Sequence, residues 1–155
     1  MSGLAHVAIK AADLEATITF YEQVIGLERV PRPPFSFPGA WLGIEGNALI
    51  HLYGGQRALG PDGSNPHETG SVDHVSFWAQ GYAAQRARFE RFGLPFREAR
   101  PPETTLAQMF SLDPNGVMLE LTYELRNEPD VEPGRRNDPL RWDPSLYAQF
   151  AGARR

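Results

Sequence analysis

Hydrophobic and polar residues alternate along residues 4–10, with Val7 and Ile9 on one side and His6 on the other. Because successive side chains of a strand point to opposite faces, this pattern predicts a half-buried strand. Apolar residues then recur at helical spacing, and Gly26 is placed to end that helix. The chain therefore begins with a strand followed by a helix.

The same order of elements occurs twice. Residues 4–9 recur as residues 72–77, an offset of 68, and residues 48–52 recur as residues 116–121 at a similar offset. A repeat too short to close its own core predicts two modules that share one sheet system. We therefore expect an α+β fold of two β-α-β-β-β modules forming a curved mixed sheet, with the helices on its outer face. Further strands are expected at residues 40–44, 47–53, 72–78, 95–99, 106–112 and 117–123, a second helix at 83–92, and turns at 45–47 and 113–116.

A segment rich in Gly and Pro, residues 54–71, separates the two copies of the repeat. We expect a single domain over residues 1–125, with module one at about 3–55 and module two at about 71–124. The remaining residues, 126–155, are rich in Pro and charge and are expected to form a C-terminal extension.

The composition narrows the range of functions. The 155 residues suffice for one well-buried domain, and the formal net charge of −4 argues against a nucleic-acid surface, which needs clustered positive charge. Since the chain has no Cys, any transition metal must be held by imidazole and carboxylate groups. Neither a signal peptide nor a stretch of about 18 apolar residues occurs, so we expect a cytoplasmic protein without membrane partners.

Four potential metal ligands share one strand face. His6, His51, His74 and Glu120 each alternate with the apolar residues expected to pack under the helices, so all four are expected to point away from the helices. A lone strand histidine is more often hydrogen-bonded to a neighbour than bound to a metal, and a lone strand glutamate is usually solvated. Four such residues at repeat-related positions favour a divalent metal site. His67 has no repeat partner, and no role is assigned to it.

These residues and motifs resemble the vicinal oxygen chelate superfamily, which includes glyoxalase I, bleomycin resistance proteins, fosfomycin-resistance proteins, methylmalonyl-CoA epimerase and extradiol dioxygenases. The similarity covers residues 4–123 and is carried by the His-containing repeats at 4–9 and 72–77, and by the turn at 113–116 with the strand that follows it. The resemblance implies a metal on the concave face of paired modules, where it holds two vicinal oxygens of a substrate or intermediate.

The resemblance also implies roles for the four residues. His6, His74 and Glu120 match ligand positions shared by most metal-dependent members, and His51 matches a fourth position where other members have a carboxylate or amide residue. The implied cofactor is one divalent metal per site, which is Zn, Ni, Co, Mn or Fe(II). A histidine at the fourth position departs from the family pattern and leaves the chemistry open.

Three functions remain open on this basis. If His51 binds the metal, two coordination positions remain, which favours a glyoxalase-like lyase or isomerase acting through a metal-chelated enediolate, with Glu120 as the proton carrier and His51 assisting. If His51 stands off the metal, the other three residues form the two-His-one-carboxylate triad of an extradiol-type Fe(II) ring-cleaving dioxygenase of a catechol-like substrate. A metal-free, drug-binding protein is the third hypothesis. The lyase or isomerase is the preferred one.

Aromatic residues are expected to bind the substrate near the metal. Such side chains line small-molecule pockets, although they also occur in cores and subunit interfaces. The expected substrate-binding residues are Phe35, Trp41, Tyr53, Trp78 and Phe110. Arg32 or Arg97 could pair with a substrate carboxylate, although surface arginines usually have no such role. The expected partner is a small aromatic or apolar oxygenated molecule, and the resemblance further implies a homodimer.

Overall fold

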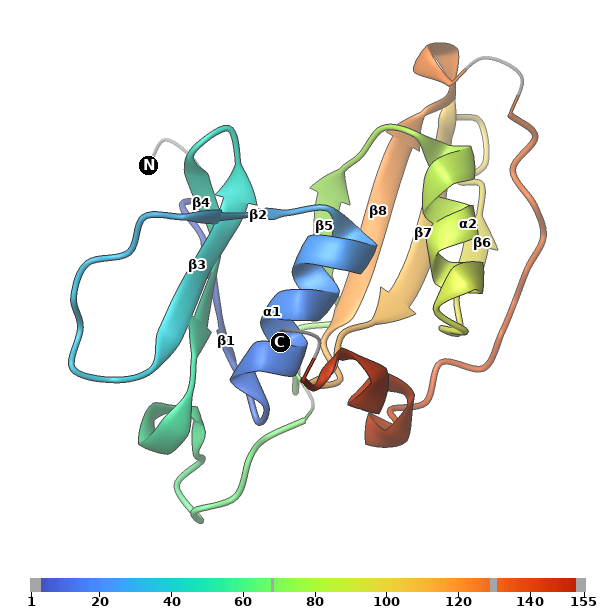
Figure 1. Cartoon of the computed structure of the whole chain (residues 1–155). Coiled ribbons are helices and arrows are strands. Elements are labelled where there is room, and N and C mark those ends of the chain that lie inside the picture. The colour runs from blue at the N-terminus through green and yellow to red at the C-terminus, as the bar shows by residue number, and fades with distance from the viewer. Residues whose placement is uncertain (1–3, 68, 129–130, 153–155) are drawn as a thin grey trace. The chain divides into compact units, whose positions relative to one another are not determined.

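The computed structural model describes residues 4–67, 69–128 and 131–152. The chain forms two compact units, each with a four-stranded mixed sheet and an α-helix (Figure 1). Unit 1 comprises the described residues of Met1–His67 and Tyr147–Arg155, and unit 2 comprises those of Glu68–Leu146. The predicted α+β class is confirmed. Among the described residues, no helix is long and apolar enough to cross a membrane.

The strands of unit 1 are β1 (Val7–Lys10), β2 (Glu28–Val30), β3 (Gly39–Ile44) and β4 (Asn47–Tyr53). Their order in the sheet is β1-β4-β3-β2, with β1 parallel to β4 and the other neighbours antiparallel. In the turn between β3 and β4, Glu45 and Gly46 both have positive φ, of 50° and 80°. Two such residues match the twist of an antiparallel hairpin, so the turn predicted here is confirmed.

One helix packs on the sheet of unit 1. Helix α1 (Leu14–Phe20) begins where Oδ1 of Asp13 accepts a hydrogen bond from the backbone N–H of Ala16, over 2.9 Å. It continues as a π-helical turn and ends at Gly26, whose φ of 88° lies in the left-handed region, as predicted. Since α1 contacts β3 and β4, its apolar side chains are buried with those of the strands.

The end of the chain adds to the core of unit 1. A 3₁₀-helix, Pro144–Phe150, provides two buried aromatic side chains, Tyr147 and Phe150. Both rings meet the ring of Phe20 edge to face, with centroids 5.7 and 5.8 Å away. The C-terminal extension therefore includes residues that pack as core residues do.

The strands of unit 2 are β5 (Val75–Trp78), β6 (Arg97–Ala99), β7 (Leu106–Leu112) and β8 (Met118–Glu124). Their order is β5-β8-β7-β6, again with one parallel pair, β5 and β8. The turn between β7 and β8 closes with a hydrogen bond from the N–H of Gly116 to the carbonyl oxygen of Asp113, as predicted. Unit 2 thus repeats the topology of unit 1.

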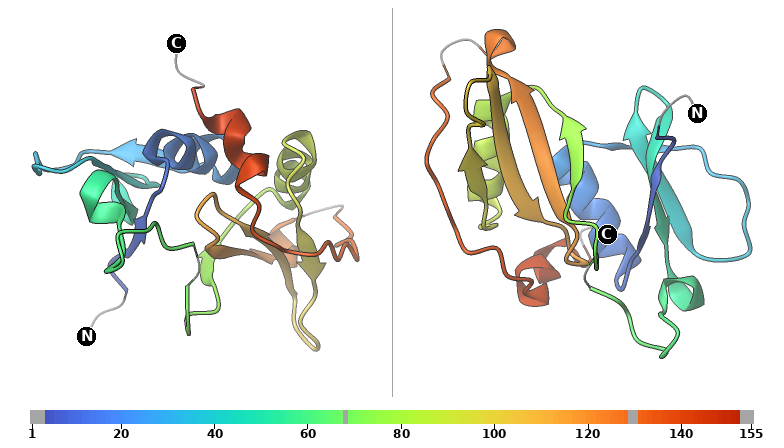
Figure 2. Two further views of the ribbon diagram at one scale, coloured as in Figure 1. Left: turned by 90° about the horizontal axis from the view of Figure 1, so that it is seen from below. Right: turned by 180° about the vertical axis from the view of Figure 1, so that it is seen from behind.

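Helix α2 (Tyr82–Arg91) lies across one face of the sheet of unit 2 (Figures 1 and 2). The ring of Tyr82 meets that of Tyr123 on β8 edge to face at 5.0 Å, and Phe89 stacks on Phe96 at 5.2 Å. All four side chains are at most 1% exposed. The helix therefore covers the apolar face of the sheet. The polar residues that alternate with the apolar ones along the strands lie on the opposite face.

Some boundaries differ from those expected. Strands β1 and β5 begin at Val7 and Val75, three residues later than predicted, so that His6 and His74 lie just before them. Strand β2 was not predicted. It has only three residues, two of them exposed, and so short a strand shows no recognisable alternation. With β2 included, both units have the predicted β-α-β-β-β order.

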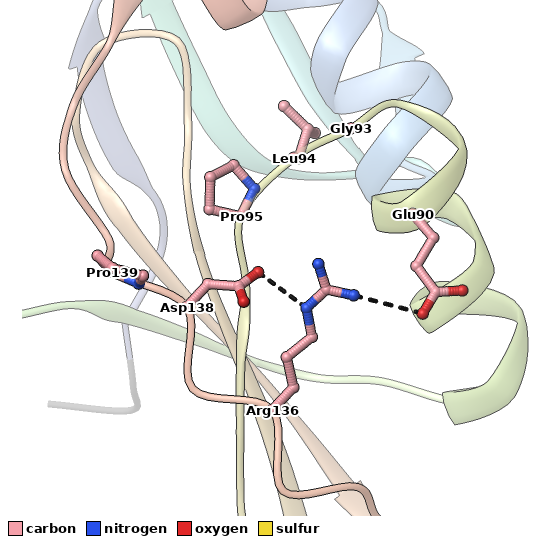
Figure 3. Close-up of a pocket in the computed structure, with 7 residues that line it drawn as sticks. All are labelled: Glu90, Gly93, Leu94, Pro95, Arg136, Asp138 and Pro139. Carbon is pink, nitrogen blue, oxygen red and sulfur yellow. Dashed lines mark hydrogen bonds and ion pairs between the residues drawn. The ribbon is translucent and has the colours of Figure 1, made fainter.

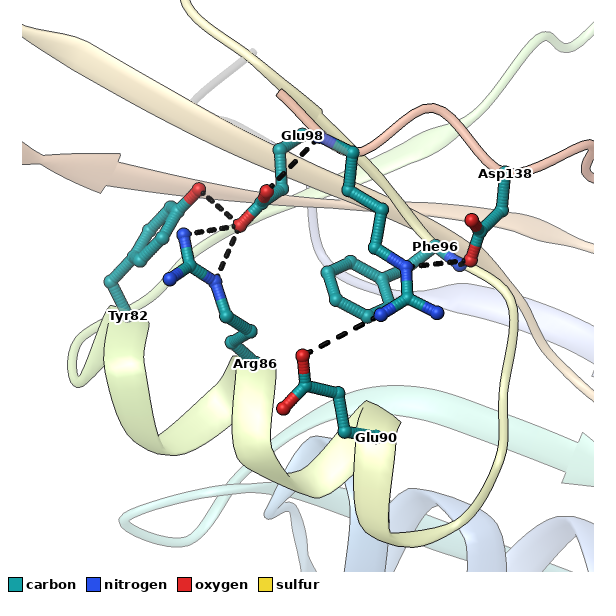
Figure 4. Close-up of polar contacts among 7 residues, drawn as sticks. Tyr82, Arg86, Glu90, Phe96, Glu98 and Asp138 are labelled. Atoms are coloured by element: carbon teal, nitrogen blue, oxygen red, sulfur yellow. Dashed lines mark hydrogen bonds and ion pairs between the residues drawn. The ribbon is translucent and has the colours of Figure 1, made fainter. Parts of the chain in front are cut away.

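The segment around Arg136 pairs with the outer edge of β6. The backbone N–H of Glu98 donates to the carbonyl oxygen of Arg136 over 2.8 Å, and Arg97 forms an antiparallel bridge with Asn137. The guanidinium of Arg136 also lies over the ring of Phe96, 4.4 Å from its centroid. Figure 4 shows Phe96 with Glu98 and Asp138. Backbone groups that are paired in this way are not available to a strand of another protein.

Candidate functional site

The candidate ligands occupy equivalent places in the two sheets. In unit 1, Ala8 of β1 pairs in parallel with His51 of β4, and in unit 2 Ser76 of β5 pairs in parallel with Glu120 of β8. A histidine stands two residues before Ala8, and another stands two residues before Ser76. Because paired residues of neighbouring strands share a face, each unit brings one histidine and one further ligand to the same face.

In unit 1, His6 and His51 form a stacked pair. Their ring centroids are 3.8 Å apart with an interplanar angle of 16°, and the ring of Trp41 also stacks on His51, with centroids 4.1 Å apart. His51 is buried, and burial lowers its pKa, which the adjacent His6 lowers further. The His51 ring is therefore held in its neutral form, the form in which an imidazole nitrogen can bind a metal or accept a proton.

In unit 2, both ring nitrogens of His74 lie beside carboxylates. Nε2 is 2.9 Å from Oε2 of Glu120, and Nδ1 is 2.7 Å from Oδ1 of Asp73. A neutral imidazole has one N–H, so it can donate to only one of these carboxylates. If that donor is Nδ1, the lone pair of Nε2 faces an oxygen of Glu120 across a distance at which a cation would be shared by both.

The other oxygen of Glu120 is fixed by three hydrogen-bond donors. Oε1 accepts from Nε2 of Gln108 at 2.7 Å, from Oγ of Ser76 at 3.1 Å and from Oγ1 of Thr122 at 2.5 Å. The carboxylate is therefore oriented with Oε2 toward His74. The three donors were not identified from the sequence. The three residues share one sheet face with Glu120, on β5, β7 and β8. This can be recognised only once the register of the strands is known.

The four candidate ligands are thus found as two pairs, one in each unit. Within the described part of either unit, no third His, Asp or Glu joins a pair to form a metal-holding group. The donors are imidazole nitrogens and a carboxylate oxygen, which suit Zn, Ni, Co, Mn and Fe(II). The chemistry of the donor set therefore fits the metals expected from the sequence.

Four of the five predicted substrate-binding aromatics lie on the same sheet faces as these pairs, and Phe35 lies in the loop before β3. In unit 1, Trp41 is paired with His51, while Phe35 and Tyr53 both contact Phe37, which is not one of the five predicted residues. In unit 2, Phe110 is paired with Glu120, and its ring meets His74 edge to face at 5.9 Å.

Trp78 is the most exposed of the five predicted aromatics, at 74%. It is paired with Thr122 and so shares a sheet face with Glu120. Of the two arginines considered as carboxylate partners, Arg97 donates through Nε to the carbonyl oxygen of Asp138 over 3.0 Å. This contact gives Arg97 a structural role in holding the C-terminal segment.

An open pocket of about 490 Å³ lies elsewhere in unit 2, between the end of α2 and the segment after residue 135 (Figure 3). It is lined by Glu90, Gly93, Leu94, Pro95, Arg136, Asp138 and Pro139. Arg136 donates to Asp138 over 2.8 Å and forms an ion pair with Glu90 at 3.5 Å. None of the candidate ligands or predicted aromatics lines this pocket, so it is separate from the candidate site.

Comparison with known proteins gives one family and several relatives. The family model described as "Glyoxalase/Bleomycin resistance protein/Dioxygenase superfamily" matches residues 3–121. Glyoxylase I 4 of Arabidopsis thaliana is 26% identical over 126 residues, which cover 78% of this chain and 70% of that protein. A solved glyoxalase family protein from Bacillus anthracis aligns with a TM-score of 0.62 at 24% identity, covering 80% of this chain and 96% of the other. A lactoylglutathione lyase from Agrobacterium tumefaciens aligns with a TM-score of 0.58 at 25% identity, covering 79% and 94%.

Proposed function

Because the chain belongs to the glyoxalase/bleomycin resistance protein/dioxygenase superfamily, we propose that it is a divalent-metal-dependent enzyme with lyase or isomerase chemistry. The proposed substrate is a small oxygenated molecule with an aromatic or apolar portion. The proposed metal ligands are His6, His51, His74 and Glu120.

The observation that carries the proposal is the contact between His74 and Glu120. When Asp73 accepts the N–H of His74 at Nδ1, the lone pair of Nε2 lies beside Oε2 of the carboxylate. A divalent cation bound there would accept lone pairs from both atoms. A carboxylate that orients a histidine through its other nitrogen is the usual arrangement around protein-bound metals.

The second pair supports the proposal independently. The lowered pKa of His51 keeps that ring neutral near pH 7, and the stacked rings of His6 and Trp41 restrict its motion. The neutral form of imidazole binds transition metals, and restricted motion of the ring favours that binding. The metal, when bound, supplies Lewis acidity and stabilises negative charge that develops on a substrate oxygen.

The residues also suggest where a proton is held. Oε1 of Glu120 already accepts three hydrogen bonds, so Oε2 is the oxygen that we propose to take a proton from the substrate, at a stage at which the metal does not hold it. His51 is proposed to assist. Its lowered pKa leaves the ring neutral, and a neutral imidazole has a nitrogen that can accept a proton. The aromatic rings beside His51 and His74 are proposed to hold the apolar part of the substrate.

The proposal is tested by metal analysis of anaerobically purified protein, wild type beside His51→Ala. We expect near-stoichiometric Zn, Ni, Co or Mn in the wild type and a sharp fall in the variant. After loading with Fe(II), we expect no oxygen uptake with a panel of catechols. A protein that holds no metal, and that keeps its ligand binding in His74→Ala, would contradict the proposal and indicate a binding protein.

A ring-cleaving dioxygenase is the second candidate. In this alternative His51 is not a ligand, and its ring, which stacks with those of His6 and Trp41, would be an acid or base beside the metal. His6, His74 and Glu120 would then leave three coordination positions for a catechol and dioxygen. Iron retained in His51→Ala, together with oxygen consumption by the wild type, would establish this alternative. Homodimerisation and a cytoplasmic location remain predictions from the sequence.

A further inference from the structure

We propose that the sheet face of unit 1 that carries His51 also contains a binding subsite for an anionic group, such as a carboxylate, attached to an aromatic or other planar part of the substrate. Arg57 is proposed to bind the anion, and Phe37 and Tyr53 to bind the planar part. The inference rests on the proposed function, because this subsite would select the substrate of the same site.

The subsite shares a strand and a face with a candidate ligand. His51 and Tyr53 are two residues apart on β4, so their side chains point to the same side of the sheet. On the neighbouring strands, Trp41 is paired with His51, and Lys10 is paired with Tyr53. A substrate that reaches His51 therefore meets Tyr53 at the next position along the strand.

Four aromatic side chains form a continuous surface here, which we call the aromatic shelf: Phe35, Phe37, Trp41 and Tyr53. Phe37 meets Tyr53 edge to face at 5.5 Å and stacks on Phe35 at 5.4 Å. Phe35 is in turn 6.3 Å from Trp41, which stacks on His51. The shelf therefore extends from a candidate ligand to the end of β4, and it can hold a flat ring against its own rings.

Three cationic side chains border this shelf. The guanidinium of Arg57 lies 5.2 Å from the centroid of Phe37 and 6.0 Å from that of Tyr53. The guanidinium of Arg32 lies 4.9 Å from Phe37 and likewise 4.9 Å from Phe35. Lys10, on the same face, donates through Nζ to the carbonyl oxygen of Leu59 over 2.7 Å. Both guanidinium groups are thus oriented by aromatic faces.

The two guanidinium groups bring positive charge to the shelf of a chain whose formal net charge is −4. Arg29, Arg86 and Arg136 form ion pairs with carboxylates. Among the described residues, the ion pairs found include none between a carboxylate and Arg32 or Arg57. Two like charges held beside the same ring repel each other, so an anion bound between them would be stabilised by both.

Arg57 is better placed than Arg32 to receive that anion. Arg32 already donates from Nη2 to the carbonyl oxygen of Phe37 over 2.9 Å, so its guanidinium helps to hold the loop that carries the ring. Arg57 lies in a short 3₁₀-helix directly after β4, and its side chain is exposed. Its planar fork of N–H groups matches a carboxylate.

The test is isothermal titration of the full-length protein, kept metal-free with a chelator, with phenylacetate and with its neutral analogue phenylacetamide. Without metal, a carboxylate cannot gain affinity by coordination. We expect the acid to bind about tenfold more tightly than the amide, which is the effect of one charged hydrogen bond. Arg57→Gln should abolish this preference and leave the affinity for the amide unchanged, and Arg57→Lys should retain part of it.

Arg100→Gln is the matched control, because it removes an exposed arginine of unit 2 and should change neither affinity. Equal binding of acid and amide by the wild type, absence of measurable binding of either, or a preference that survives in Arg57→Gln would overturn the inference. Metal analysis decides the proposed function separately. If the protein binds metal but does not prefer the acid, only the subsite is contradicted. If it prefers the acid but binds no metal, only the enzymatic proposal is contradicted.

Discussion

Tyr82 and Tyr123 lie edge to face in the core of unit 2 with ring centroids 5.0 Å apart, and their hydroxyl groups are in opposite situations. The hydroxyl of Tyr82 donates to Oε1 of Glu98 over 2.9 Å. The hydroxyl of Tyr123 is buried without a hydrogen-bond partner among the described residues. Because a buried polar group without a partner costs free energy, the two tyrosines should respond differently to loss of the hydroxyl.

The first prediction compares Tyr82→Phe with Tyr123→Phe. Tyr82→Phe removes a hydrogen bond to a charged group and should lower the free energy of unfolding by about 2 kcal/mol. Tyr123→Phe removes an unsatisfied hydroxyl and should leave that free energy unchanged or raise it by about 1 kcal/mol. Urea unfolding of both variants at pH 7 measures the difference. An equal loss in the two variants would show that the hydroxyl of Tyr123 has a partner in solution.

Alkaline pH should weaken unit 2 through Tyr82. Burial, and then the adjacent Glu98 carboxylate, raise the pKa of Tyr82 from 10.0 to about 12. Between these two values the unfolded chain loses a proton that the folded protein keeps, so the free energy of unfolding falls as pH rises, by at most about 1.4 kcal/mol per pH unit for one group. Below pH 10 this contribution is fully present.

The measurement is urea unfolding at intervals from pH 9 to pH 12, with wild type beside Tyr82→Phe. Burial also raises the pKa of Tyr123, so both proteins should lose stability in this range. The wild type should lose more, and the advantage it holds at pH 9 should shrink toward pH 12. Parallel curves for the two proteins would mean that Tyr82 titrates in the folded state as it does in the unfolded chain.

The orientation of Glu120 should depend on Gln108. Nε2 of Gln108 donates to Oε1 of Glu120 over 2.7 Å, which helps to turn Oε2 toward His74. Loss of a partner that orients a metal ligand typically lowers metal affinity by about 10- to 100-fold. We therefore expect Gln108→Ala to weaken Co(II) binding by a factor in that range, measured by competition with a chelating dye.

Gln80→Ala provides the control for this experiment, because Gln80 is exposed and lies just beyond β5. Its metal affinity should match that of the wild type. Thermal unfolding of the metal-free proteins separates positioning from folding, since a positioning role predicts a loss of affinity larger than any loss of stability. Unchanged Co(II) affinity in Gln108→Ala would refute the role assigned to this side chain.

Most elements of the fold could be predicted from the periodicity of the sequence. Alternation predicted the faces of β4 and β8 correctly, since His51 and Glu120 do lie opposite the apolar residues that pack under the helices. The repeat offset predicted their equivalence, which the paired registers confirm. Strand β2 was missed because three residues are too few to show a period.

The partners around the ligands were beyond the reach of that pattern. Gln108 and Arg57 come next to the candidate site through strand register and loop conformation, which alternation along one strand does not encode. The candidate ligands stood out because histidine and glutamate are uncommon on such strands. Glutamine and serine on an exposed strand face carry no comparable signal.

The proposed function depends on His6, His51, His74 and Glu120 being metal ligands. The most direct measurement is a spectrophotometric Co(II) titration of metal-free protein, for the wild type and for His6→Ala, His51→Ala, His74→Ala and Glu120→Ala. We expect stoichiometric Co(II) binding by the wild type and weakened Co(II) binding by all four variants. Absence of stoichiometric binding by the wild type, or unchanged Co(II) affinity in the variants, would contradict the proposal.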